Sequence, residues 1–129
     1  MRKCIFILLV ILAVSYRLEA KKQEVVMPSG KEIYIPKDLQ GMDLQNPDSK
    51  WSYHRMAYTD NFVIFWEKGF GNDLSNPPQL EGHDMKVDLP NLMGKLESFY
   101  RFFRDTLEFS RPGSKCDKYR MMVMLNYSL

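Results

Sequence analysis

Two short, wholly apolar runs constrain this chain more than any other feature. Phe62–Trp66 and Met121–Leu125 contain no polar residue. Successive side chains of a strand point to opposite faces of a sheet, so strands of this composition need cover on both faces. Such runs are typical of a sheet that lies between other layers. The sequence therefore predicts one strand at residues 62–66 and another at residues 119–125.

One amphipathic helix is predicted between these strands, over residues 89–109. Asp88 is suited to cap its N-terminus, and Pro90 lies in the first turn, where the missing N–H costs nothing. Pro112 and Gly113 follow its last turn. Apolar residues recur at spacings of three and four and form one stripe: Leu89, Leu92, Met93, Leu96, Phe99, Tyr100, Phe103 and Leu107.

The charged face of this helix is interpreted as a solvated surface. Glu97, Arg101 and Asp105 follow one another at spacings of four residues, as do Arg104 and Glu108. Such pairs support a helix without any ligand. The order strand, helix, strand favours a parallel crossover. The predicted fold class is α/β (or α+β), a small sheet with one long amphipathic helix.

A single helix covers only one face of such a sheet. The preceding segment, residues 21–50, is polar and interrupted by proline and glycine, with a weak strand signal at residues 32–35. It is interpreted as an irregular lead-in, and residues 51–129 as a partial domain whose natural fold continues past residue 129. The alternative is that the lead-in folds back as the missing cover. Its small number of apolar residues argues against that alternative.

The N-terminus has the pattern of a secretory signal peptide, predicted over residues 1–20. Arg2 and Lys3 precede the apolar run Cys4–Val14, and small residues follow, with cleavage open after Ser15 or after Ala20. The apolar run is shorter than the roughly 20 residues that span a bilayer, so no stable membrane anchor is expected. The chain is therefore predicted to be exported, to a periplasm, a cell surface or the medium.

Loss of this leader would change the charge and the cysteine content. It removes three basic residues and one acidic residue, so the formal net charge of +2 falls to zero. A neutral chain lacks the basic footprint of a nucleic-acid-binding protein. Only Cys116 remains, which excludes an internal disulfide. It is interpreted as an incidental thiol beside a turn, with a reactive thiol or an intermolecular bridge as the alternative.

No catalytic or metal-binding motif is recognised in the sequence. His54 and His83 are too far apart along the chain for a zinc motif, and no His-Glu-x-x-His helix is present. Gly69 and Gly71 are interpreted as turn residues after a strand. The oxygen-bearing residues that follow lack the alternation of a calcium loop: Asn72, Asp73, Ser75 and Asn76. No cofactor is therefore predicted for this chain.

Aromatic residues supply the one candidate binding surface. Trp51, Tyr53, Tyr58 and Trp66 lie in or near the strand region and are candidates for a platform that stacks on sugar rings. The competing interpretation is that they belong to the core, where aromatic side chains of adjacent strands usually pack.

Three segments resemble the N-terminal part of a family of exported bacterial proteins of uncharacterised function. They are Trp51–Arg55, Asn61–Gly71, and Gly113–Tyr119 leading into Met121–Leu125. Full-length members of that family resemble zinc metallopeptidases and continue into a helix with a His-Glu-x-x-His-like motif. The resemblance implies a zincin-like N-terminal lobe. This chain stops before such a motif, so no ligand is carried over, and zinc is implied only for a full-length relative.

The leading functional hypothesis is an exported, truncated N-terminal lobe of a metallopeptidase-like protein, without catalytic activity of its own. The alternative is a complete small exported binding module that recognises a glycan or a partner protein through its aromatic strand region. A third hypothesis is a hydrolase whose site is completed by a second chain.

Overall fold

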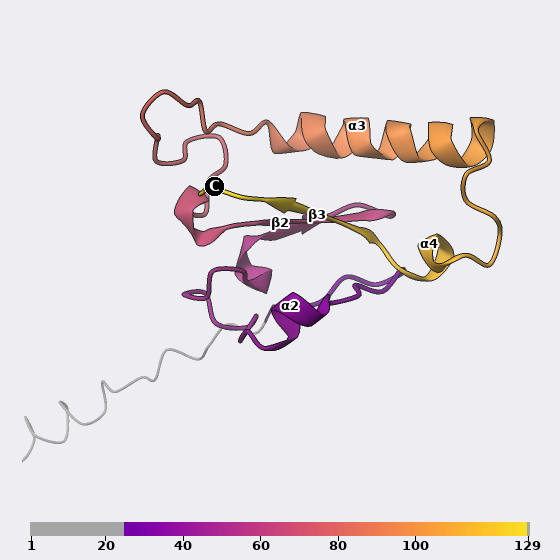
Figure 1. Cartoon of the computed structure of the whole chain (residues 1–129), viewed down its shortest axis with the longest axis horizontal. Coiled ribbons are helices and arrows are strands. Elements are labelled where there is room, and N and C mark those ends of the chain that lie inside the picture. Colours follow the sequence, from indigo (N-terminus) through magenta and orange to yellow (C-terminus); the bar gives the residue numbers. More distant parts are fainter. Residues whose placement is uncertain (1–24, 129) are drawn as a thin grey trace, which may run out of the picture.

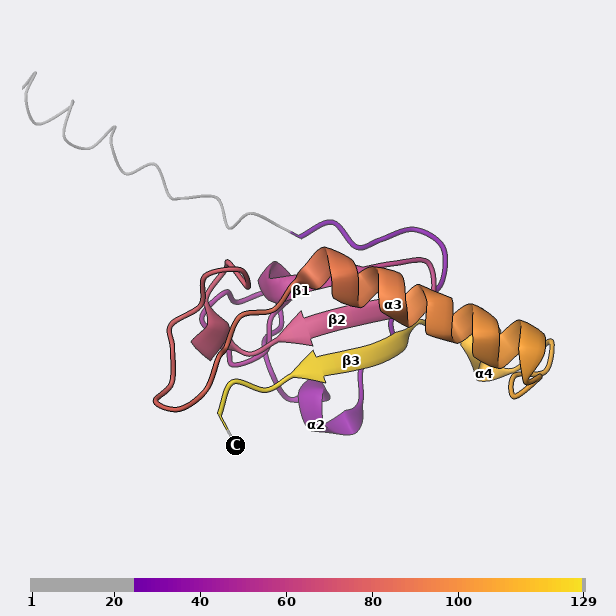
Figure 2. The same cartoon turned by 90° about the horizontal axis from the view of Figure 1, so that it is seen from above.

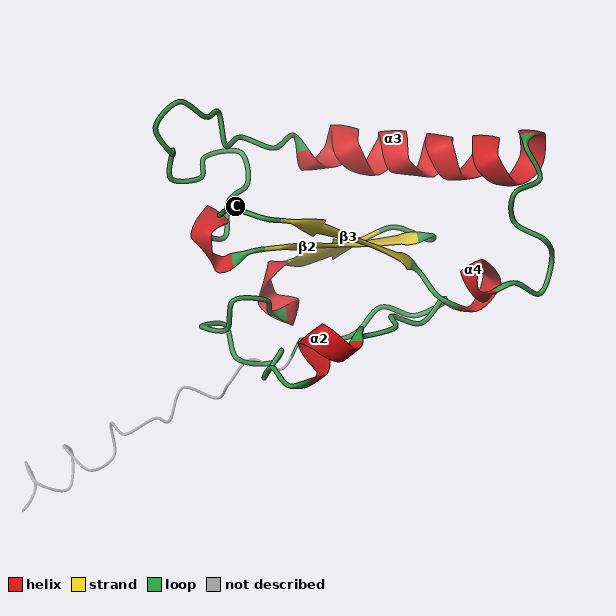
Figure 3. Cartoon of the chain, in the orientation of Figure 1, coloured by secondary structure: helices red, strands yellow, loops and turns green. Residues whose placement is uncertain are grey.

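A computed structural model describes residues 25–128, and the leader predicted at residues 1–20 lies outside them. The fold is α+β, built on a three-stranded mixed sheet in the order β1-β2-β3 (Figures 1 and 3). β1 (Met56–Tyr58) is antiparallel to β2 (Phe62–Trp66), and β3 (Met121–Leu125) is parallel to β2. The prediction of two apolar strands joined by a parallel crossover is therefore confirmed. The central strand β2 is buried at all five positions.

The crossover helix lies along one face of the sheet, as Figures 1 and 2 show. α3 (Leu89–Arg101) has thirteen residues, and a π-helical turn η3 (Phe102–Thr106) adds five more. The predicted cap is present, because the Asp88 carboxylate accepts a hydrogen bond from the backbone N–H of Asn91 at 3.0 Å. The helix ends before the predicted residue 109. Glu108 has a φ of 52°, a left-handed conformation that no helix continues through.

The lead-in segment covers the second face of the sheet. Leu39 and Leu44 are buried there against Val63 and Phe65 of β2, and Ile33 and Ile35 pack beside them. Figure 3 shows this cover as mostly loop, with one short helix, α2 (Lys37–Gln40). The expectation of a bare second face is therefore wrong for the described residues. The alternative, in which the lead-in folds back, is the arrangement that the structure has.

Some strand signals in the sequence give less regular structure than expected. The weak strand at residues 32–35 reduces to one parallel bridge between Glu32 and Tyr119, and β3 begins at Met121 rather than at residue 119. The aromatic stretch before β1 starts with a 3-10 turn. Three further short helical elements complete the structure: η1 (Tyr53–Arg55), η2 (Lys68–Phe70) and α4 (Lys115–Lys118).

The buried side chain of Arg120 joins three distant parts of the chain. It is only 6% exposed. Its guanidinium donates to the carbonyl oxygen of Ser29 at 2.9 Å, to that of Thr59 at 2.6 Å, and to that of Lys31. The lead-in, the β1–β2 turn and the start of β3 are therefore held by a single cation. These bonds satisfy most of its donors, as a buried charge requires.

A polar junction fixes the helix over the β1–β2 turn. The Glu97 carboxylate accepts hydrogen bonds from the Thr59 hydroxyl and from the backbone and side-chain N–H groups of Asn61, the latter two at 2.9 and 2.8 Å. Burial acts to raise the pKa of Glu97, but these hydrogen bonds outweigh it and hold the pKa below its ordinary value. The lead-in joins this junction through the Lys31 ammonium, which donates to the Asn61 side chain at 2.6 Å and to the Tyr100 hydroxyl at 3.1 Å.

The charged face of the helix is therefore not simply a solvated surface. Glu97 binds the β1–β2 turn, and Arg104 lies 3.3 Å from the Asp117 carboxylate in α4. Both contacts join the helix to residues that are distant in sequence. Spacing along the helix could not reveal them, because it reports only neighbours on the same helix.

Candidate functional site

The four aromatic residues singled out in the sequence do not share one surface. Trp51 is 5% exposed and belongs to the core under the lead-in, where Tyr53 is half-buried. Tyr58 is exposed, with the Arg120 guanidinium 5.4 Å from its ring centre. Trp66 lies on the opposite side of the sheet, in a separate apolar cluster. These residues therefore form no common stacking platform. Tyr53 lines a cleft of about 350 Å³ beside the lead-in, and Trp66 lines a larger one on the other side of the sheet.

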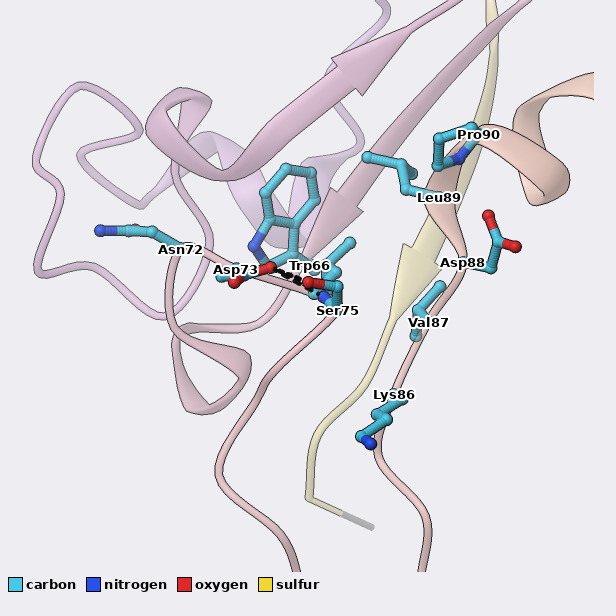
Figure 4. A pocket seen from close by; sticks show the side chains of 10 residues that line it. Trp66, Asn72, Asp73, Ser75, Lys86, Val87, Asp88, Leu89 and Pro90 are labelled. Atoms are coloured by element: carbon cyan, nitrogen blue, oxygen red, sulfur yellow. Dashed lines mark hydrogen bonds between the residues drawn. The ribbon is translucent and has the colours of Figure 1, made fainter.

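That cleft lies beyond the carboxyl end of β2, beside the entry to α3 (Figure 4). Its volume is about 580 Å³. In sheets with parallel strands, ligands commonly bind outside the carboxyl ends of the strands. The lining comes from two stretches around Trp66: Asn72, Asp73, Leu74 and Ser75 from the loop after η2, and Lys86, Val87, Asp88, Leu89 and Pro90 from the approach to α3.

Backbone and core contacts hold the two walls of the cleft together. The backbone N–H of Val87 donates to the carbonyl oxygen of Leu74 at 2.8 Å, across the mouth of the intervening loop. Leu74 is buried beside Trp66 and Phe70. The indole N–H of Trp66 donates to the carbonyl oxygen of Gly71 at 2.9 Å, which fixes the orientation of the ring. The floor of the cleft is therefore built from packed apolar side chains.

The rim of the cleft is polar and carries charges of both signs. Asp73 accepts hydrogen bonds from the Ser75 hydroxyl at 2.6 Å and from the Ser75 backbone N–H at 2.9 Å. These bonds lower the pKa of Asp73, so its carboxylate is ionised at neutral pH. Lys86 adds an ammonium group to the opposite wall, and Asp88 adds the carboxylate that caps α3. Hydrogen-bond donors and acceptors therefore surround an apolar floor.

Two glycines shape the loop that leads to the cleft, one through its backbone conformation and the other through close packing. Gly71 has a φ of 71°, a conformation that favours glycine. A Cβ atom on Gly69 would lie 2.1 Å from a ring carbon of Tyr127. The interpretation of these glycines as turn residues is confirmed. The contact with Tyr127, from the segment after β3, was not visible in the sequence.

The C-terminal segment is attached to the same end of the sheet by Glu67. Its carboxylate accepts hydrogen bonds from the backbone N–H of Tyr127 and from the Ser128 hydroxyl, both at 3.0 Å, and lies 3.5 Å from the Lys50 ammonium. Burial acts to raise the pKa of Glu67, but these partners outweigh it and hold the pKa below its ordinary value.

The histidines and the cysteine lie apart from the cleft. A ring nitrogen of His54 is 3.0 Å from the carbonyl oxygen of Gln45. Cys116 is a free, half-buried thiol in α4. Among residues 25–128, no three histidine, cysteine, aspartate or glutamate side chains are placed to hold a metal ion. Over the same range, no helix is long and apolar enough to cross a membrane.

Only some of the residues that line the cleft were singled out from the sequence. Asn72, Asp73 and Ser75 were considered as oxygen ligands, whereas Asp88 was recognised only as a helix cap and Lys86 and Val87 were not singled out. The available signal was positional, because polar residues that follow a buried strand lie at its carboxyl end. The second wall of the cleft is positioned by the fold of the loop that joins the two walls, and sequence periodicity does not predict the fold of such a loop.

Comparison with known proteins places the chain in a family. No curated protein and no solved structure matches it. A family model described as a family of unknown function (DUF6055) matches residues 25–129. The matched range includes the lead-in, the sheet, the crossover helix and the cleft. The chain therefore belongs to DUF6055, a family of unknown function.

Proposed function

We propose that this chain is an exported, non-catalytic binding module whose cleft accepts a neutral, hydroxylated ligand such as a sugar unit of a glycan. The supporting observation is an apolar floor formed by Val87, Leu89 and the 7% of Trp66 that is exposed. Hydrogen-bonding groups at Asp73, Ser75 and Lys86 form the rim above it. A sugar ring has apolar C–H faces and hydroxyl edges, and this arrangement complements both. The volume of about 580 Å³ lies in the range typical of small-ligand sites.

The charge balance of the rim favours a neutral ligand. Asp73 and Asp88 are negative and Lys86 is positive, so a strongly anionic or cationic ligand would meet a like charge. Hydroxyl groups both donate and accept hydrogen bonds. They suit carboxylate acceptors and an ammonium donor at the same time.

The export part of the proposal rests on the N-terminal sequence alone. Arg2, Lys3 and the apolar run Cys4–Val14 have the composition of a secretory leader. Glycans of cell surfaces would be available to a protein on that route.

The test is direct binding of defined sugars to the purified chain. A panel of mono- and oligosaccharides is screened by glycan array, and the best binder is titrated by isothermal calorimetry. Asp73→Ala removes a rim carboxylate and should weaken that binding about tenfold, equivalent to about 1.4 kcal/mol. Glu81→Ala is the control, because Glu81 is an exposed carboxylate in the same loop but outside the cleft lining. Equal losses in both variants, or no saturable sugar binding up to about 10 mM, would refute the proposal.

The other candidate is the non-catalytic lobe of a metallopeptidase-like protein. It is supported by the resemblance of the segments around Trp51–Arg55 and Asn61–Gly71. Its second argument, a sheet face without cover, no longer applies, because Leu39 and Leu44 cover that face. The cleft therefore makes the binding module the better supported of the two.

A further inference from the structure

Among the described residues, the outer edge of β3 has no strand partner along most of its length. The backbone N–H of Met121 points towards β2 and donates to the carbonyl oxygen of Asn61 at 2.8 Å. The backbone N–H of Arg120 points the other way and donates to the carbonyl oxygen of Glu32 at 2.8 Å. Because these directions alternate along a strand, the N–H groups of Met122 and Met124 point to the outer edge. Glu32 occupies only the start of that edge. Within residues 25–128, no strand pairs with the rest of it.

This edge lacks the features that protect exposed strands. Soluble proteins usually place charges, prolines or bulges on such edges. Met121–Leu125 has no charge and no proline, and its register with β2 is continuous over all five residues. Every side chain of β3 is half-buried. An added strand would therefore find an open row of backbone partners with apolar side chains on both faces.

An apolar cavity flanks the start of this edge on each face of the sheet. On the face of the lead-in, a cavity of about 440 Å³ is lined by Tyr34, Pro36 and Met122. On the face of the helix, a cavity of about 250 Å³ is lined by Phe99, Phe103 and other residues. Neighbouring residues of an added strand point to opposite faces. Two adjacent apolar residues could therefore fill the two cavities together.

The charges and the shape around the edge favour a polypeptide segment over a second copy of this chain. Lys115 and the buried Arg120 line the first cavity, and Arg104, which pairs with Asp117, lines the second. Among the described residues, no carboxylate pairs with Lys115 or Arg120, so the region around the first cavity keeps a positive charge. An antiparallel second β3 would bring no acidic residue to them, because its own flanks are Arg120 and Asn126–Ser128. α2 lies on the face opposite α3 (Figure 1) and projects past β3 on the side of the free edge (Figure 2). It would support one added strand, whereas a second copy would bring a second α2 to the same place.

We propose that β3 accepts, as a fourth strand, an extended segment of a partner protein with a continuous apolar core of about four residues and an acidic flank. This interaction is separate from the sugar site, because none of the cleft-lining residues belongs to β3 or to its two flanking cavities. Its recognition combines backbone hydrogen bonds with side-chain cavities, the usual mode of strand addition.

The test uses a fluorescent probe peptide with the core Leu-Val-Ile-Val between Asp residues. Its binding to the full chain is measured by fluorescence anisotropy. Met124→Pro removes an outward N–H but no donor to β2, and proline is tolerated at such edge positions. It should weaken binding at least tenfold. Met124→Ala is the matched control, since it loses the same side chain but keeps the N–H, and should bind within about threefold of the wild type. A peptide with N-methylated core residues should not bind.

The remaining outcomes overturn the proposal. One is that the peptide binds equally tightly to the wild type and to Met124→Pro when both proteins melt cooperatively. Another is the absence of saturable binding up to about 1 mM peptide. A third is concentration-dependent dimerisation in sedimentation velocity that Met124→Pro abolishes, because it would assign the edge to a second copy. A peptide with Lys in place of Asp that binds as tightly would overturn the acidic flank.

Discussion

Leu39→Ala tests the finding that the lead-in is a structural layer of the fold. Leu39 is 4% exposed and packs in one cluster with Val63 and Phe65 of the central strand. Truncation of a buried leucine to alanine destabilises proteins by about 2–5 kcal/mol, from lost transfer energy and from the cavity left behind. An open cleft of about 350 Å³ already borders Leu39, so water can enter the vacated space. We therefore expect a loss in the lower half of that range, about 2–3 kcal/mol.

The measurement is urea unfolding of the purified chain, followed by tryptophan fluorescence. With a dependence of about 1–3 kcal/mol per molar urea, the loss should lower the midpoint by about 1–2 M. Val26→Ala is the matched control, because Val26 lies in the same lead-in but is 88% exposed. It should shift the free energy of unfolding by no more than about 0.5 kcal/mol. If the two variants unfold at the same urea concentration, the lead-in is not part of the folded core.

Two further predictions concern the polar junction and the loop glycines. The folded-state pKa of Glu97 is depressed, so the carboxylate stabilises the fold above its ordinary pKa of 4.5, and this contribution disappears as the pH falls through the folded-state value. Glu97→Gln should therefore lower the free energy of unfolding by about 1–2 kcal/mol at pH 7 and by much less at pH 3. Urea unfolding at both pH values measures this difference. An equal loss at both would contradict the role of the charge. Gly69→Ala should destabilise the chain by about 1–3 kcal/mol, because its Cβ would lie 2.1 Å from Tyr127. In the background of Tyr127→Gly, which removes the Cβ atom at 2.9 Å as well as the ring, the same change should be nearly neutral. A full destabilisation in that background would point to backbone strain instead.

Regular elements were predictable because their signals are local. β2 occupies residues 62–66 as expected, and α3 begins after the Asp88 cap. The end of the helix was less predictable. Pro112 and Gly113 suggested a late stop, but the chain leaves the helix at Glu108 through a left-handed residue, a position that glycine more often takes.

The covering layer was missed because irregular segments have no period. Ile33, Ile35, Leu39 and Leu44 are dispersed among polar residues, prolines and glycines, so no helical or strand pattern connects them. Their common burial is a property of the tertiary fold. The aromatic platform failed for the related reason that sequence proximity does not decide which face of a sheet a side chain reaches. Trp51 and Trp66 lie on opposite sides of it.

The guanidinium of Arg120 has a consequence for how the chain is made. It joins Thr59 to Ser29 and Lys31 through contacts that span 61, 91 and 89 residues. A ribosome or an export channel releases the N-terminal part first, and that part must wait for residues near 120 before these contacts can form. Contacts between such distant residues slow folding. The nascent protein should therefore remain open, and accessible to chaperones and proteases, until the residues around Arg120 have emerged.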